Sequence, residues 1–339
     1  MSVTRAALAA LLLLCAGAAA AEDYQTLLTS KPNIGPRGRA GWDEYLQQPL
    51  HRAFAISPSG SWAYRTGSTS LGDAIEGAVA NCQKGSRTRC ELYAAESALA
   101  RGGGIPPNPQ PVRAGELASA DGYFHAGPSR AKGAIVWSHG RAPGLKDSRG
   151  TPMPPFVVYF ANAGWDVFRF DRDPRQDEVN WATAKLDEGA RLLRRLGYAR
   201  VVAAGGSRGA WHSLAALREP GVLDGVIAAA PAMHGTSDAG PKTRRGMADY
   251  RTLLERVADS RARIALFVFD DDEYDPDPPA RAELAERAIG EKGNPRLVMR
   301  PAGISGHSAA GSRDFTLRYA PCLVRFIESV TPGPYACVD

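Results

Sequence analysis

The chain has 339 residues, which is enough for one large domain and a smaller one, and it carries 41 Lys and Arg against 36 Asp and Glu. The two signs of charge often alternate, as they do between Asp171 and Asp177, and this pattern is typical of a solvated surface. The small and dispersed basic excess excludes an extended nucleic-acid-binding face.

Residues 1–21 have the pattern of a secretory signal peptide. One basic residue, Arg5, precedes an apolar run through Leu11–Leu14, and the small residues Ala16–Ala21 offer a cleavage site before Glu22. The apolar run is too short for a stable transmembrane helix, and no other stretch is apolar enough to cross a bilayer. We therefore expect a periplasmic or secreted protein without a membrane span; the alternative is a retained N-terminal membrane anchor.

Removal of this segment would leave four cysteines, Cys82, Cys90, Cys322 and Cys337. An even number of cysteines in an exported protein indicates disulfides, because oxidising compartments let them form and persist. Proximity in the sequence favours the pairs Cys82–Cys90 and Cys322–Cys337, although four cysteines allow three pairings. No two cysteines form a C-x-x-C pair, so the sequence predicts neither a zinc site nor a redox-active dithiol.

Residues 22–100 are expected to form a small α+β module. The stretch Arg52–Tyr64 predicts two short strands around a Ser-Pro-Ser-Gly turn. Leu71–Gln83 has apolar residues at helical spacing, and Cys90–Ala95 alternates like a strand. A helix that ends near Cys82 and a strand that opens with Cys90 could bring the two thiols within bridging distance.

Residues 50–96 resemble a small module of exported bacterial proteins. The resemblance rests on the strand-pair pattern F-A-I-S-x-x-G-x-W, from Phe54 to Trp62, and on the Ala-rich helix bearing a cysteine. The module contains no reactive group of residues, so we interpret it as a disulfide-stapled structural unit. A contact with the cell envelope is the alternative.

Residues 101–129 are expected to hold a linker and the first strands, because the Gly- and Pro-rich stretch 101–111 can form neither a helix nor a central strand. From residue 130 to 339, apolar strands alternate with amphipathic helices. Strands are predicted at 133–138, 165–170, 200–204, 225–230, 264–269 and 296–300. This alternation predicts an α/β fold with a mostly parallel sheet covered on both faces, whose ligands bind at the carboxyl ends of the strands.

Gly205–Gly209 has the pattern G-x-S-x-G. It follows the strand predicted at 200–204 and opens a helix predicted at 210–217. A nucleophile elbow needs this placement, because small flanking residues allow a strained turn that projects the serine over the sheet edge. Ser207 is therefore the candidate nucleophile. The alternative is a serine that only caps the helix.

A serine hydroxyl needs a base, and the base needs a carboxylate to orient it. His307 lies in the loop between the last strand and the final helix, and can reach over the elbow. The carboxylate is expected in the acidic run after the strand at 264–269. Asp272 fits best, because Pro276 follows it at the spacing of a D-x-x-x-P loop, and Asp271 is the alternative. The alternative for this acidic run is a calcium-binding loop, but the run lacks the glycine that such a loop needs at its sixth position.

The oxyanion of an acyl-transfer intermediate needs two backbone donors. One is expected to be the N–H of Arg208, which follows the nucleophile. The other is expected from Ser138–Arg141 at the end of the first core strand, where a His-Gly pair is the usual oxyanion turn. The N–H of Arg141 is the candidate.

With the order Ser207, Asp272, His307, the elbow and the His-Gly loop, residues 130–330 resemble the α/β-hydrolase superfamily, closest to its dienelactone-hydrolase and serine-peptidase-like branches. The resemblance implies acyl transfer to water through an acyl-enzyme, without a metal or an organic cofactor. We expect an exported hydrolase of a small-molecule carboxylic ester. The alternatives are an amidase or peptidase with the same triad, and a non-catalytic binding protein on a hydrolase scaffold. Residues 233–260 are expected to form a short cap or mouth loop.

Overall fold

The computed structural model describes residues 26–337, apart from 101–111, 142–145, 234–240, 276 and 332–334. The predicted signal peptide at 1–21 and the Gly- and Pro-rich stretch at 101–111 lie outside the described residues. None of the described helices is long and apolar enough to cross a bilayer.

The larger part of the chain is built on an eight-stranded sheet with the order β12-β11-β10-β9-β7-β8-β6-β5. Its strands are β5 (Arg113–Ala114), β6 (Leu117–Ser119), β7 (Ala134–Ser138), β8 (Asp166–Phe170), β9 (Val201–Gly206), β10 (Gly225–Ala229), β11 (Arg263–Phe267) and β12 (Arg296–Met299). From β8 to β12 all neighbours are parallel, and only β5 and β6 pair antiparallel. The predicted mostly parallel α/β sheet is confirmed.

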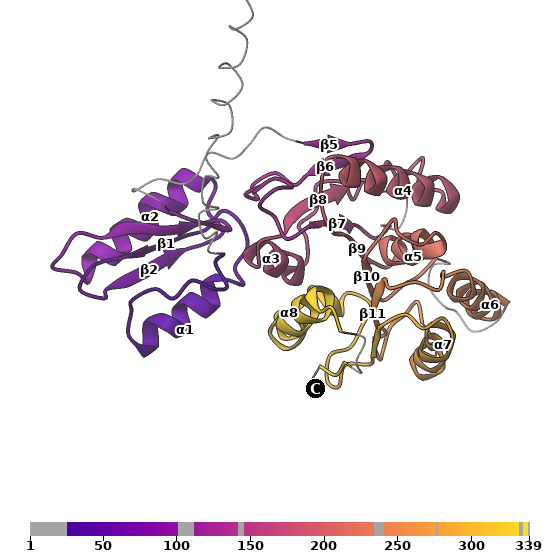
Figure 1. Ribbon diagram of the computed structural model, residues 1–339. Helices are drawn as coiled ribbons and strands as arrows, with labels where there is room; N and C mark the ends of the chain where they lie inside the picture. Colours follow the sequence, from indigo (N-terminus) through magenta and orange to yellow (C-terminus); the bar gives the residue numbers. More distant parts are fainter. Residues whose placement is uncertain are drawn as a thin grey trace, which may run out of the picture.

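Helices cover both faces of this sheet (Figure 1). They are α3 (Pro155–Asn162), α4 (Val179–Arg195), α5 (Arg208–Ala215), α6 (Pro241–Glu255), α7 (Pro278–Gly290) and α8 (Arg313–Glu328). The strands alternate strictly between the two layers. On β7, Val136 packs into the core under α4 to α7, whereas Ile135 and Trp137 pack under α3 and α8. Both faces of the sheet are buried under helices, which is why the central strands are apolar without interruption.

A second, antiparallel sheet with the order β2-β1-β3-β4 lies beside α3 (Figure 1). Its elements are α1 (Pro36–Tyr45), β1 (Ala53–Ile56), β2 (Trp62–Arg65), α2 (Leu71–Lys84), β3 (Glu91–Ala95) and β4 (Ala98–Leu99). Alanines of α2 pack on one face, and the aromatic rings of Trp42 and Tyr45 pack around Phe54 on the other. The disulfide Cys82–Cys90 joins the end of α2 to the start of β3.

One buried arginine ties the small sheet to the large one. Arg52 is 0% exposed, and its guanidinium donates to the carbonyl of Tyr45 at 2.6 Å and to Oδ1 of Asn162, the last residue of α3, at 2.7 Å. The Nδ2 of Asn162 donates in turn to the carbonyl of Leu46 at 2.6 Å. These bonds give partners to both terminal nitrogens of the guanidinium and to both polar atoms of the Asn162 amide, whereas Nε of Arg52 is buried without a hydrogen-bond partner.

The second disulfide joins Cys322, inside α8, to Cys337 near the C-terminus. Replacing both cysteines with alanine is expected to lower the free energy of unfolding by about 3 kcal/mol, because a bridge that closes a loop of this length restricts the unfolded chain. Urea denaturation of wild type and double variant measures the difference, with Cys82–Cys90 intact in both. Equal midpoints would contradict the prediction.

Candidate active site

Ser207 lies at the turn between β9 and α5, at the carboxyl edge of the sheet. Its backbone has φ 53° and ψ −120°, a conformation that costs free energy for a residue with a side chain. Its amide donates to the carbonyl of Ala229 at the end of β10, at 3.0 Å, which fixes the turn to the neighbouring strand. Strain of this kind is the mark of a nucleophile elbow, because it pushes the serine out of the sheet edge.

The flanking glycines are required by close backbone approach. A Cβ on Gly209 would lie 2.0 Å from the carbonyl oxygen of Ser138, and a Cβ on Gly205 would lie 2.3 Å from the carbonyl carbon of Gly209. Strand β7 and helix α5 therefore pack closer at the elbow than any side chain permits. This contact is the physical reason for the G-x-S-x-G pattern here.

His307 lies in the loop between β12 and α8, and the structure pairs it with Asp272. Its Nδ1 lies 2.8 Å from Oδ1 and 3.0 Å from Oδ2 of the carboxylate. Asp272 is buried, and its Oδ1 also accepts the N–H of Tyr274 at 2.8 Å. Asp271, the alternative, is exposed and holds the turn at φ 55°. Of the two candidate carboxylates, the structure brings Asp272 to the imidazole.

Ser207 and His307 line one cavity of about 420 Å³. Gly140 and Arg141 line it from the end of β7, and Tyr274 lines it from the loop after β11. The hydroxyl of Ser207 and the imidazole share this cavity without a direct hydrogen bond, a separation that catalytic pairs often close only when substrate binds. Among the described residues, no group of three or more His, Cys, Asp or Glu is placed to hold a metal ion.

The predicted oxyanion turn lies directly against the serine. A Cβ on Gly140 would lie 3.2 Å from the Cβ of Ser207, so the chain passes the candidate nucleophile at close contact distance. Arg141 follows at the rim of the cavity. On the other side, Arg208 is the first residue of α5, where backbone N–H groups have no acceptor within the helix. The structure places both predicted donor residues beside Ser207.

A buried arginine, Arg172, stabilises the turn that carries His139 and Gly140. Arg172 is 1% exposed, and its Nη1 donates to the hydroxyl of Ser138 at 2.5 Å. Its backbone N–H donates to Nε2 of His139 at 3.0 Å, and its Nη2 donates to the carbonyl of His139. The charge is balanced by Asp177, whose Oδ1 lies 2.7 Å from Nε. Arg172 therefore holds the two residues that precede Gly140.

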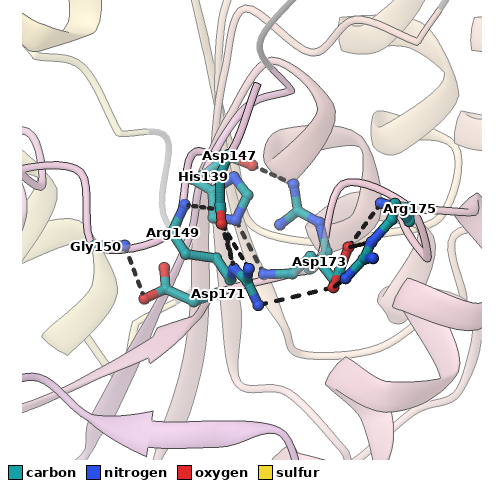
Figure 2. A network of polar contacts seen from close by, with 8 residues as sticks. His139, Asp147, Arg149, Gly150, Asp171, Asp173 and Arg175 are labelled. Carbon is teal, nitrogen blue, oxygen red and sulfur yellow. Dashed lines mark hydrogen bonds and ion pairs between the residues drawn. The ribbon is translucent and has the colours of Figure 1, made fainter. Parts of the chain in front are cut away.

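Figure 2 shows His139 together with a network of ion pairs between the segments 147–150 and 171–175. Arg149 pairs with Asp147 and reaches Asp173 at 3.8 Å, and Arg175 also pairs with Asp173. The N–H of Gly150 donates to Asp171 at 3.2 Å. These contacts join the loop near residue 150 to the segment that follows β8.

His212, on α5, is buried behind the elbow with its Nε2 3.2 Å from Oδ1 of Asp177. Burial lowers the pKa of His212 to about 4, against the opposing effect of Asp177, which raises it. The imidazole is therefore held neutral in the folded protein over the range in which an exposed histidine takes up a proton.

Stability is expected to fall as the pH drops from about 6.5 to about 4. In this range the unfolded chain protonates His212 at its ordinary pKa of 6.5 while the folded protein does not, so the unfolded state binds more protons. The shift corresponds to about 3 kcal/mol at pH 4. Urea midpoints at pH 7, 5 and 4 measure it, and His212→Gln is expected to flatten the slope. An equal slope in the variant would contradict the prediction.

Several residues of the site were not predicted. Tyr274 packs its ring 4.2 Å from the imidazole of His307, and nothing in the sequence marks it beyond its place in the acidic run. The charge alternation from Asp171 to Asp177 indicated a solvated surface. That interpretation is wrong for Arg172 and Asp177, which are buried because this segment lies beneath the His139 turn.

The prediction of a cap or mouth loop at 233–260 is also wrong for the described residues of this segment. Residues 241–255 form α6, whose Tyr250 and Leu254 are buried in the core beside α5 and α7. The described residues of this segment do not line the cavity of Ser207. Their apolar residues at helical spacing are used for packing on the sheet. Residues 234–240 lie outside the described residues.

The elbow, its position on β9 and the order of the eight-stranded sheet together decide the fold. The chain has the α/β-hydrolase fold.

No family model and no curated protein sequence matches the chain. Among solved structures, it is similar to a puromycin hydrolase at 18% identity, over 70% of this chain and 42% of that one, with a TM-score of 0.48. It is also similar to Pyrococcus horikoshii acylaminoacyl peptidase, at 15% identity over 73% and 47%, with a TM-score of 0.48. Thermogutta terrifontis esterase 2 aligns at 17% identity over 66% and 97%, with a TM-score of 0.46. The chain covers less than half of the first two proteins.

Proposed function

We propose that this α/β-hydrolase-fold chain is a serine hydrolase that cleaves a carboxylic ester through an acyl-enzyme. The observation that carries the proposal is the pairing of His307 with the buried carboxylate of Asp272, beside the strained Ser207 in one cavity. A helix-capping serine needs neither that strain nor a histidine–carboxylate pair within reach. The combination favours nucleophilic catalysis over a binding role on the same scaffold.

We assign the following roles on the basis of this arrangement. The Oγ of Ser207 attacks the substrate carbonyl carbon as Nε2 of His307 takes the hydroxyl proton, and Asp272 stabilises the imidazolium from the Nδ1 side. The backbone N–H groups of Arg208 and Arg141 bind the oxyanion, each contributing about 3–4 kcal/mol of transition-state stabilisation. The C–O bond to the leaving alcohol breaks, and the alcohol takes the proton from His307. Water then hydrolyses the acyl-enzyme by the same steps.

A fluorophosphonate probe tests the proposal directly. Intact mass of the wild-type protein is expected to show one adduct, which is absent from Ser207→Ala and from His307→Ala. The control is Ser148→Ala, which removes another hydroxyl of the cavity and is expected to label like wild type. A folded wild-type protein that forms no adduct with the probe would contradict the proposal.

An amidase or peptidase would use the same three residues. Matched substrates separate the two, such as a p-nitrophenyl ester and the p-nitroanilide of the same acid. We expect the larger kcat/KM on the ester. A larger kcat/KM on the anilide would overturn the ester assignment and leave the serine hydrolase intact.

We also propose that the protein acts in the periplasm or outside the cell, with residues 22–100 as a small disulfide-stapled structural module; a contact of this module with the cell envelope is the alternative. The two disulfides support an oxidising compartment. The mature protein recovered from the periplasm or medium is expected to begin near Glu22. An intact N-terminus on the exported protein would contradict cleavage at this site and favour the retained anchor, and protein found only in the cytoplasm would contradict export. Co-sedimentation of the mature protein with purified envelope would favour the alternative role of residues 22–100 as an envelope contact.

A further inference from the structure

Three alternate residues of the loop after β11 hold the loop that carries His307. The carbonyl of Asp270 accepts the N–H of Gly306 at 2.7 Å, and the carboxylate of Asp272 lies 2.8 Å from Nδ1 of the imidazole. The ring of Tyr274 lies against the imidazole, with 4.2 Å between the ring centroids and 44° between the ring planes. The first two contacts fix the backbone and one nitrogen, and the third covers part of the imidazole ring.

The turn before His307 has little packing of its own. A Cβ on Gly303 or on Gly306 would meet no atom within 4 Å. The side chain of His307 is nevertheless only 13% exposed, and that of Asp272 only 3%. Tyr274 is half-buried and lines the cavity of Ser207, so its ring is one of the groups that keep water from the histidine–carboxylate pair.

The proposed reaction turns this imidazole into a cation. The Nε2 of His307 takes the hydroxyl proton of Ser207, while Asp272 stays ionised at the Nδ1 side. An aromatic face attracts a cation that lies within about 6 Å of the ring centroid, and the attraction is stronger where water is excluded. The ring of Tyr274 is within this distance. It therefore stabilises the imidazolium more than the neutral imidazole, which lowers the barrier of the step that forms the cation.

Tyr274 makes a second contact with the pair through its backbone. Its N–H donates to Oδ1 of Asp272 at 2.8 Å, and this is the carboxylate oxygen closer to Nδ1 of His307. Any residue other than proline can make this hydrogen bond. Replacing the side chain at position 274 therefore leaves the support of the carboxylate in place and tests the ring alone.

We propose that Tyr274 is a positioning residue, whose ring holds the imidazole of His307 over the cavity of Ser207 and stabilises its protonated form during acyl transfer. This inference rests on the proposed function. Among the described residues the phenol hydroxyl of Tyr274 has no hydrogen-bond partner, so the aromatic face, and not the hydroxyl, carries the role.

Two substitutions separate the aromatic face from the apolar bulk of the side chain. Tyr274→Leu keeps an apolar group without a face, and kcat on a p-nitrophenyl ester is expected to fall about tenfold, with KM within about twofold of wild type. Tyr274→Phe keeps the face, and its kcat is expected to stay within about twofold. Tyr159→Leu is the matched control, because Tyr159 is also half-buried but does not line the cavity, and it is expected to keep the wild-type kcat.

The pH profile gives a readout that a loss of packing alone would not move. A less stabilised cation loses its proton at lower pH, so the acid limb of kcat/KM is expected to move down by about one pH unit in Tyr274→Leu and to stay in place in Tyr274→Phe. The midpoint of the limb does not depend on the fraction of active enzyme, and so remains informative if the leucine variant is partly unfolded. The charged and titratable side chains that line the cavity or the base of the His307 loop are the same in all variants: Asp270, Asp272, Glu273, Arg300, His139 and Arg141.

Three results would overturn the inference. A loss of kcat in Tyr274→Leu with an unmoved acid limb would show that the ring only supports the loop. An equal loss in Tyr274→Phe would assign the effect to the hydroxyl, and a wild-type kcat in Tyr274→Leu would show that the ring has no role. The proposed function survives each of these results if the wild type takes the fluorophosphonate label. A wild type that takes no label would overturn the proposed function, and the inference with it.

Discussion

Replacing Asp272 with asparagine is expected to lower kcat by about 10⁴-fold. The amide keeps the size of the side chain but cannot stabilise the imidazolium, and it favours the wrong tautomer of His307 by donating to Nδ1. The measurement is ester turnover under saturating substrate, with circular dichroism to show that the variant is folded. The matched control is Asp271→Asn, one residue away, exposed and outside contact with the imidazole. Its kcat is expected to stay within a few-fold of wild type.

The reverse pattern, in which Asp271→Asn abolishes turnover and Asp272→Asn does not, would overturn the assignment of the triad carboxylate. Equal losses in both variants would contradict it as well, because they would show that the loop, rather than one carboxylate, sets the activity.

Replacing Arg172 with methionine is expected to lower the free energy of unfolding by about 3–5 kcal/mol. The variant leaves Asp177 as an uncompensated buried charge, and removes the donors to Ser138 and His139. Urea denaturation measures the loss. Arg175→Met, which breaks the exposed pair with Asp173, is the control and is expected to cost less than about 1 kcal/mol.

The double variant Arg172→Met/Asp177→Leu is expected to recover most of that stability, because the stranded charge is gone. Its turnover is not expected to recover, since the turn that carries Gly140 has still lost its support from Arg172. A double variant with wild-type kcat would show that the turn does not depend on this arginine.

Much of the large sheet could be predicted from the sequence, because its signals are local. Uninterrupted apolar strands such as β7 and β10 mark a sheet buried on both faces. The glycines around Ser207 mark a place where backbones touch, and the structure shows the contacts that require them. The positions of Ser207, His307 and Asp272 at strand ends follow from the same alternation. Their catalytic roles, and the domain boundaries at 22, 101 and 130, stay predictions.

The remaining features depend on contacts between distant segments, which a local pattern does not record. Adjacent aspartates could not be separated by residue type; the turn at Asp271, with φ 55°, is what aims Asp272 at His307. Arg172 and Asp177 follow the spacing of a surface stretch but are covered by the turn after β7, more than 30 residues away in sequence. Helix α6 also depends on contacts between distant segments, because neither the length nor the charge of its sequence indicates that it packs on α5 and α7.

The junction between the two sheets has a consequence for how the molecule comes apart. The guanidinium of Arg52 belongs to the small sheet, yet one of its hydrogen bonds ends on Asn162 of α3. Separating the two parts would leave a charged group and an amide without acceptors or donors until water reached them. The two lobes in Figure 1 are thus coupled energetically, and they are expected to melt in one cooperative transition. Helix α3 begins at Pro155, next to Pro154 of the cavity wall, so the small sheet also steadies one side of the Ser207 cavity.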